Sequence, residues 1–179
     1  FLRRAQLVGP AFVQDGWACP FLALHYPTER VFFHPAFAAY PPTFYRDVYQ
    51  RTRDGEPGWA HTLDRYGVQL ALMKFTSPHE RARQQGRPNL RQRLAAAPTW
   101  ALVAFDDNGL LFVRRDGPNA AAARALAIDG VDVDALALGA DAARVRAALD
   151  AFAARGLPSQ RLAHLRTLAE GRVRSTSAD

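Results

Sequence analysis

The stretch WALVAFDDNGLLFVRR, residues 100–115, is the part of this chain that most strongly predicts its fold. Two apolar runs flank a polar turn made of Asp106, Asp107, Asn108 and Gly109. Asn-Gly tolerates positive φ at both residues and is the strongest short signal for a tight reversal, so the stretch predicts an antiparallel hairpin. Adjacent side chains on extended backbone point in opposite directions, whereas acid–base catalysis needs two carboxyl groups that face one substrate. We therefore interpret Asp106 and Asp107 as turn residues.

The chain before this hairpin alternates between strand-like and helix-like segments. Strands are predicted at residues 6–13, 30–36 and 68–75, and helices at residues 17–26, 41–53, 59–67 and 90–98. The polar residues 76–89 predict a surface loop or a poorly formed helix. Because helical crossovers connect parallel strands, the pattern predicts an α/β fold. We expect a small Rossmann-like mixed sheet of about five strands, three parallel plus the C-terminal antiparallel hairpin, with helices on its faces.

After Arg115 the composition shifts to alanine and leucine. Residues 117–128 predict a short helix and residues 130–139 a connector. Residues 140–156 and 157–172 predict two amphipathic helices that form a helical hairpin. We therefore expect an α/β domain over residues 1–116 and a helical appendage over residues 117–179, which packs on that domain or begins a helical repeat.

The composition of the chain limits the classes of function that it can have. The chain has 179 residues, of which 49% are hydrophobic and 22% charged, as in ordinary globular domains. No apolar run approaches the roughly 18–20 residues that span a bilayer. The net charge of +6 permits nucleic acid or anionic lipid as a partner without requiring either. Cys19 is the single cysteine, which excludes an intrachain disulfide, and we expect it to be a buried thiol that packs as a small hydrophobe.

Two polar residues follow predicted strands. Asp15 comes after the first strand and His34 lies near the end of the second, so both belong to the edge of the sheet where ligands of open α/β proteins bind. One interpretation is a binding pair; the other, which we favour, is a turn aspartate and a hydrogen-bonded loop histidine. The five histidines show no metal-ligand spacing. No nucleophile elbow, glycine-rich dinucleotide motif or P-loop is present, so we expect no catalytic residue, metal or cofactor.

Two further groups of residues are candidates for binding. Five arginines fall within 13 residues that contain no acid: Arg81, Arg83, Arg87, Arg91 and Arg93. Guanidinium groups suit the phosphates of lipid or nucleic acid, but the segment has no aromatic residues on which bases stack, which disfavours nucleic acid. A solvated loop and helix face is the competing interpretation. The many aromatic residues between Trp17 and Tyr49 predict core packing, with Tyr40 as the exposed candidate for carbohydrate contact.

Three stretches carry a resemblance to a known family: YPTERVFFHPAFAAYPPTFYRDVYQ, GWAHTLDRYGVQLALM and PTWALVAFDDNGLLFVRR. Together they resemble the soluble C-terminal region of large bacterial multi-spanning membrane proteins related to glycosyltransferases of the dolichyl-phosphate-mannose mannosyltransferase type. The similarity covers roughly residues 17–116 and rests on packing and turn positions. Where the family tends to have Asp-Gly-Arg, this chain has His34, Pro35 and Ala36.

In such transferases the catalytic carboxylate lies in an early loop between membrane helices, outside the region that this chain resembles. The resemblance thus implies a non-catalytic accessory or binding domain on the extracytoplasmic (periplasmic) face of a bacterial membrane. Its implied partners are the transmembrane part of the same polypeptide and a carbohydrate or lipid-linked sugar. Two alternatives stay open: a stand-alone small-ligand enzyme or binding domain that uses the strand-end cleft near Asp15 and His34, and an anionic membrane-surface or nucleic-acid contact through Arg81 to Arg93.

Overall fold

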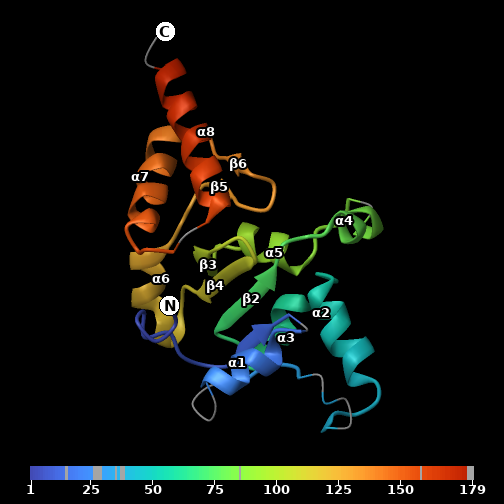
Figure 1. The fold of residues 1–179 in the computed structure, drawn as a ribbon. Helices are drawn as coiled ribbons and strands as arrows, with labels where there is room; N and C mark the ends of the chain where they lie inside the picture. The colour runs from blue at the N-terminus through green and yellow to red at the C-terminus, as the bar shows by residue number, and fades with distance from the viewer. Residues whose placement is uncertain are drawn as a thin grey trace.

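The computed structural model describes residues 1–14, 16–25, 30–34, 36, 39–84, 86–157 and 159–176, without the side chains of residues 78, 81, 83 and 176. A mixed sheet lies at its centre, with helices on both faces and two longer helices stacked beyond one edge (Figure 1). The four strands of this sheet are β1 (Ala11–Val13), β2 (Leu70–Lys74), β3 (Trp100–Phe105) and β4 (Gly109–Arg114). Their order is β1-β2-β4-β3. The α/β class is therefore confirmed.

The sheet has one parallel pair, β1 with β2, whereas β4 is antiparallel to both β2 and β3. The predicted strand at residues 30–36 is wrong in extent: it forms a single bridge, in which Val31 lies parallel to Ala11. Gly9, with φ of +106°, and Pro10, which lacks an N–H, restrict β1 to three residues. The chain then bends at Phe32, and the Phe33 ring packs 4.4 Å from Tyr49. Three parallel strands in a five-stranded sheet are not observed.

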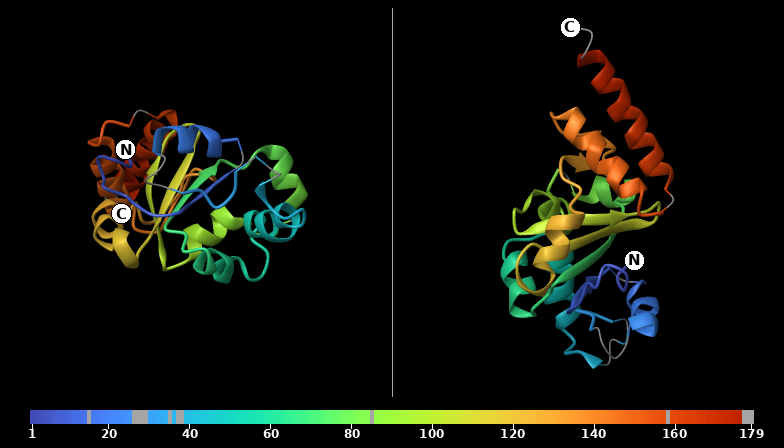
Figure 2. Two further views of the ribbon diagram at one scale, coloured as in Figure 1. Left: turned by 90° about the horizontal axis from the view of Figure 1, so that it is seen from below. Right: turned by 90° about the vertical axis from the view of Figure 1, so that its left-hand side faces the viewer.

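The helices of the first two thirds of the chain cover the two faces of the sheet. They are α1 (Ala18–His25), η2 (Tyr45–Gln50), α2 (Arg51–Arg53), α3 (Trp59–Arg65), α4 (Pro78–Gln84) and α5 (Leu90–Ala96). Figure 2 shows α1 on one side of the sheet and α5 on the other. Phe12, which pairs with Ala71, stacks on Tyr49 of η2. The face that carries Phe12 is thus closed by helices and aromatic rings.

The opposite face carries Leu70, Leu72 and Lys74, because side chains alternate along a strand. Trp17, just before α1, lies so close to Gly109 that a Cβ there would collide with the indole. The N-terminal segment, residues 1–8, approaches the same face, and its Val8 exchanges two hydrogen bonds with the Asn119 side chain, at 3.0 and 2.7 Å. Helix α1 and this segment leave the middle of the face uncovered.

The polar segment, residues 76–89, contains the short helix α4. A poorly formed helix is one of the two structures predicted for this segment. Ser77 and Glu80 exchange side-chain and backbone hydrogen bonds of 2.9 and 3.1 Å, which is the reciprocal pattern of a capping box. The local Ser-x-x-Glu spacing thus begins the helix in a segment that has no apolar period.

The predicted hairpin is confirmed as β3 and β4, and its two aspartates have different roles. Asp106 Oδ1 accepts hydrogen bonds from the backbone N–H groups of Asn108 and Gly109, which closes the turn. Asp107 points away from the turn toward the C-terminal helices. Its carboxylate accepts hydrogen bonds from the Ser159 hydroxyl at 2.7 Å and from the N–H groups of Gln160 and Arg161 at 2.9 and 3.1 Å.

The rest of the chain is helical apart from a small two-stranded hairpin. Its elements are η3 (Gly117–Asn119), α6 (Ala120–Leu126), β5 (Val131–Asp132), β6 (Ala137–Leu138), α7 (Ala142–Ala153) and α8 (Gln160–Thr176). The rings of Phe152 in α7 and Phe105 in β3 stack 4.6 Å apart. Leu149, Phe152 and Leu165 belong to the same buried cluster as the sheet, so one core joins both parts. The C-terminal helices therefore pack on the sheet.

Candidate functional site

His34 and Cys19 lie side by side near the carboxyl end of β1. The distance between Cys19 Sγ and His34 Nε2 is 3.6 Å. Cys19 is exposed, so the expectation of a buried thiol is wrong: it lies on the solvent side of α1, whereas Ala18 and Phe21 point inward. Asp15 lies outside the described residues, so its pairing with His34 stays a prediction.

The hydrogen bonds of His34 decide what this pair can do. The backbone N–H of Ala36 donates to Nδ1 at 3.0 Å, which requires Nδ1 to carry a lone pair. The ring proton of the neutral imidazole is then on Nε2, which faces the thiol. Nucleophilic catalysis by cysteine needs the opposite, an unprotonated nitrogen that accepts the thiol proton. The geometry therefore does not make Cys19 and His34 a catalytic dyad.

Tyr40 lies within an aromatic cluster. Its ring centroid is 5.0 Å from that of Phe44, on which it stacks, and 5.2 Å from that of Phe33. The ring is half-buried. Aromatic pairs of this kind stabilise a core, and the predicted core packing is confirmed for Phe33 and Phe44, whereas Tyr40, predicted to be exposed, is half-buried against them. The stacked ring leaves Tyr40 little surface for carbohydrate contact.

The three arginines between residues 81 and 93 whose side chains are described, Arg87, Arg91 and Arg93, differ in exposure. The side chains of Arg81 and Arg83 are outside the described part of the chain, Arg87 is exposed, and Arg93 is half-buried in α5. Arg91 contradicts the predicted basic surface most clearly, because only 4% of the surface of this residue is exposed. It points inward because α5 presents that position to the end of β2 rather than to solvent.

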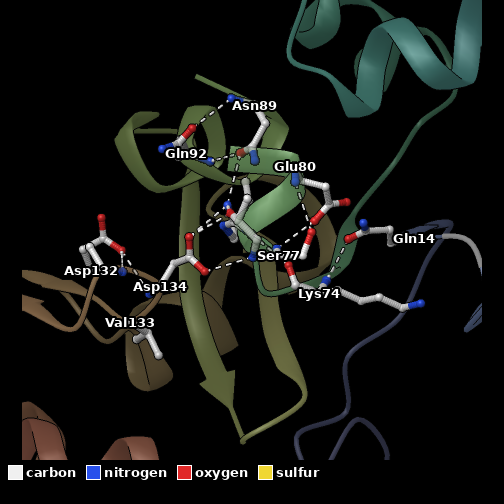
Figure 3. A network of polar contacts seen from close by, with 12 residues as sticks. Gln14, Lys74, Ser77, Glu80, Asn89, Gln92, Asp132, Val133 and Asp134 are labelled. Atoms are coloured by element: carbon white, nitrogen blue, oxygen red, sulfur yellow. Dashed lines mark hydrogen bonds and ion pairs between the residues drawn. The ribbon is translucent and has the colours of Figure 1, made fainter. Parts of the chain in front are cut away.

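Arg91 is the centre of a buried polar network. Figure 3 shows Lys74 and Asp134, two of the residues in this network. Its Nη1 donates to the carbonyl of Lys74 at 2.9 Å, and its Nη2 lies 3.1 Å from Asp134 Oδ2. Asp134 also accepts hydrogen bonds from the backbone N–H and the hydroxyl of Thr76. The network joins three segments: the end of β2, helix α5 and the β5–β6 hairpin. These contacts are internal, so they stabilise the packing of the three segments.

A polar cleft of about 290 Å³ lies beyond the carboxyl ends of β1 and β2. Gln14, Arg87 and Arg91 line it, but His34 does not. Gln14 Oε1 accepts the backbone N–H of Lys74 at 2.8 Å, and Glu80 accepts that of Ser77. The strand-end cleft thus exists, and two of the polar side chains that line it, Gln14 and Glu80, are bonded to backbone N–H groups.

An apolar groove of about 810 Å³ lies on the open face of the sheet. Its floor contains Leu70, Leu72, Ala104 and Leu111 from the three longer strands, β2, β3 and β4. Leu72 is only half-buried although it lies in an interior strand. A central strand normally has both faces covered in an α/β sheet, so a half-buried central leucine marks an incomplete layer.

Two walls border the groove. Helix α1 and the residue before it contribute Trp17, Phe21 and Leu24. Leu2 of the N-terminal segment lies on the other side. Leu24 is 64% exposed, one of the most exposed large apolar residues of the described chain. Ligand pockets are characteristically apolar clefts of about 300–1,000 Å³ with few polar groups, and this groove has that character.

Polar residues occur at the two ends of the groove. Arg3 Nη2 donates to the carbonyl of Leu24 at 2.6 Å and so joins the N-terminal segment to the last turn of α1. At the hairpin tip, Lys74 Nζ lies 5.4 Å from the centroid of the Trp17 ring. Asp106 also lines this end, but its Oδ1 is engaged by the turn.

Comparisons with known proteins do not assign this chain. No protein-family model, curated protein or solved structure matches it. Among the described residues, no helix is long and apolar enough to cross a membrane, and no group of three or more His, Cys, Asp or Glu side chains is placed to hold a metal ion.

The groove was missed by sequence reasoning. The apolar run of residues 70–73 indicates a strand buried on both faces. Nothing in that pattern distinguishes a face covered by a helix from a face that borders an apolar groove. The one local signal is Gly109, whose missing side chain allows Trp17 to pack against the sheet and form one end of the groove.

Proposed function

We propose that this chain is a non-catalytic binding domain that holds an apolar ligand in the groove between α1, the N-terminal segment and the sheet. We further propose that it is the extracytoplasmic accessory domain of a glycosyltransferase-like integral membrane protein. The observation that carries the binding function is the half-buried Leu72 at the centre of an apolar groove of about 810 Å³.

Two observations support binding rather than catalysis. Catalytic sites combine polar or titratable groups with a cleft in which they converge. Here the apolar groove contains few polar groups, and the Cys19–His34 pair has the imidazole proton on the wrong nitrogen for thiol activation. The accessory role on a membrane protein is supported by the resemblance of residues 17–116 alone.

The proposed binding site is tested by a substitution in the floor of the groove. Leu72→Glu places a charged side chain in the groove, and we expect it to reduce binding of an environment-sensitive apolar dye, such as N-phenyl-1-naphthylamine, by at least tenfold. Leu168→Glu is the matched control, because Leu168 is an exposed leucine on α8. Fluorescence titration of the folded 179-residue variants measures the dissociation constants. Equal dye binding by the Leu72→Glu variant and the wild type would contradict the proposed site.

The proposed absence of catalysis by this chain, and its accessory role, have a test of their own. The purified 179-residue chain is expected to show no transfer of sugar from a lipid-linked donor to acceptor oligosaccharides. The full reading frame is expected to encode transmembrane spans before Phe1. Sugar transfer by the isolated chain, or a frame without such spans, would overturn the accessory role while leaving the groove as a binding site.

A further inference from the structure

Building on the proposed function of the groove, we infer that its ligand is an amphiphile: a hydrocarbon tail of about ten carbons lies along the sheet, and an anionic head group binds at the end formed by Arg3 and Arg4.

The length of the groove follows from α1, which forms one wall. Trp17 packs on Gly109 at the hairpin tip, and Leu24, in the last turn of α1, is bonded to Arg3. The eight residues of α1 span about 12 Å at 1.5 Å per residue. An extended hydrocarbon chain advances roughly 1.25 Å per carbon, given a C–C bond of about 1.5 Å, so about ten carbons match this length.

The lining of the groove favours a hydrocarbon tail as its occupant. The leucine and alanine side chains of the floor offer no hydrogen-bond partners, and a hydrocarbon tail needs none.

The charges of the lining residues give the tail a direction. Arg3 and Arg4 are both exposed and both line the groove. Arg3 uses one of its five N–H donors for the Leu24 carbonyl and keeps the others for a ligand. The described carboxylate that lines the groove is Asp106, which belongs to the hairpin tip, the end where Trp17 rather than Leu24 lies. Lys74 also lies at the hairpin-tip end, beside Trp17, and Asp106 offsets its charge there. The net positive charge is therefore at the Arg3 end, which attracts an anionic head group.

Guanidinium groups bind carboxylate and phosphate in the same planar, bidentate manner, so the shared chemistry of the head group is its negative charge. The experiment has separate arms for the two chemistries. Alkanoates, alkyl monophosphates and neutral alkanols with six to fourteen carbons are titrated below their critical micelle concentrations against the 179-residue chain. The chain is N-terminally acetylated, so that the α-ammonium of Phe1 adds no charge to the groove.

We expect the dissociation constant to fall about fourfold for each added methylene, the effect of burying one CH₂, up to about ten carbons and then to level off. At ten carbons, at least one anionic series is expected to bind tenfold or more tightly than the alkanol. Preference for phosphate over carboxylate, or the reverse, identifies the head group, and either outcome supports the inference.

Arg4→Gln is expected to reduce the preference for the anion at least threefold, and Arg3→Gln/Arg4→Gln to abolish it, with alkanol binding unchanged. Arg4→Gln leaves the bond between Arg3 and Leu24 intact, which separates head-group binding from stabilisation of the N-terminal segment. The matched control is Arg144→Gln/Arg146→Gln, which removes the same charge from exposed positions on α7.

Equal binding of anionic and neutral amphiphiles of the same length, with a normal dependence on chain length, would overturn the inference about the head group and leave the groove function standing. The absence of any plateau near ten carbons would overturn the inferred tail length. Failure of every amphiphile to bind, together with unchanged dye binding by Leu72→Glu, would overturn the proposed function itself.

Discussion

At the scale of single residues, Arg91 shows how position overrides residue type. It belongs to a run of five arginines that suggests a basic surface, yet its side chain is 5% exposed and lies against Asp134, whose side chain is 12% exposed. A buried ion pair contributes little net stability compared with apolar residues of the same size, but its partners are costly to separate. The contact between α5 and the β5–β6 hairpin therefore depends on Arg91.

Replacing Arg91 is expected to destabilise the protein strongly. Arg91→Met leaves the Asp134 carboxylate buried without its cation, which costs about 3–5 kcal/mol of unfolding free energy. The double variant Arg91→Met/Asp134→Leu is expected to regain most of that loss, because no charge then remains buried. Urea denaturation measures both values. A loss below about 1 kcal/mol in the single variant would show that this pair behaves as a surface ion pair.

At the scale of elements, the hairpin turn of β3 and β4 also begins helix α8. The first N–H groups of a helix have no partners within the helix, and an oxygen acceptor nearby stabilises them. In α8 the side chain of Asp107, about fifty residues earlier in the chain, accepts from Gln160 and Arg161. These N–H donors, followed by the Ser159 hydroxyl, lower the pKa of the Asp107 carboxyl below its usual value.

The lowered pKa of Asp107 predicts that the stability of α8 depends on pH. A carboxyl group whose pKa is lower in the folded state stabilises that state above its unfolded-state pKa, near 4, and loses this effect as the pH falls through the folded-state pKa. Stability is therefore expected to decline below about pH 4, with the amides of Gln160 and Arg161 losing protection from hydrogen exchange first.

Two variants separate the charge of Asp107 from its hydrogen bonds. Asp107→Asn keeps an oxygen acceptor and is expected to retain most of the protection of α8 at neutral pH, whereas Asp107→Ala is expected to lose it. In both variants, the part of the stability loss below about pH 4 that comes from protonation of Asp107 should be absent. Unchanged exchange at Gln160 and Arg161 in Asp107→Ala would contradict the capping role.

At the scale of the whole molecule, one buried cluster extends from the sheet into α7 and α8. Phe152, which is fully buried, stacks on Phe105 of β3, and Arg155 donates to the carbonyls of Val103 and Leu126 at 2.8 and 3.0 Å. Burial lowers the pKa of the Arg155 guanidinium. The boundary near residue 116 therefore divides two types of structure that share a core.

A shared core predicts one cooperative unfolding transition. The three tryptophans lie within residues 1–116, so their fluorescence follows the α/β part, whereas circular dichroism also follows α7 and α8. The two probes are expected to give the same midpoint. Phe152→Ala should lower the unfolding free energy by about 3–5 kcal/mol and shift both probes together. Separate midpoints would instead support two independent domains.

The sequence predicted local structure well wherever neighbours in the chain determine it. The Asn-Gly turn between two apolar runs specified the β3–β4 hairpin, and the amphipathic period with Gly156 specified the α7–α8 hairpin. The strand predicted at residues 30–36 failed because pairing needs a partner: β1 is only three residues long, and the rings of Phe32 and Phe33 are committed to the aromatic cluster.

Candidate site residues were harder to predict than helices and strands. The sequence singled out Asp15, His34, Tyr40 and the arginine run because of their types and order. Whether a side chain reaches a ligand depends on which segments pack against it. His34 lies against Cys19 and Arg91 against Asp134, and both partners are remote in the sequence, whereas Tyr40 stacks on the nearby Phe44.

The sequence by itself determined the α/β class, the central hairpin, the helical C-terminal third and the turn role of Asp106, because each depends on short-range propensity and periodicity. Only the tertiary structure decided that Asp107 caps α8, that Arg91 is buried and that an apolar groove lies over Leu72. These features arise where distant segments meet or fail to cover one another, and the free energy of burial depends on the surface that neighbours remove from water, which no local pattern records.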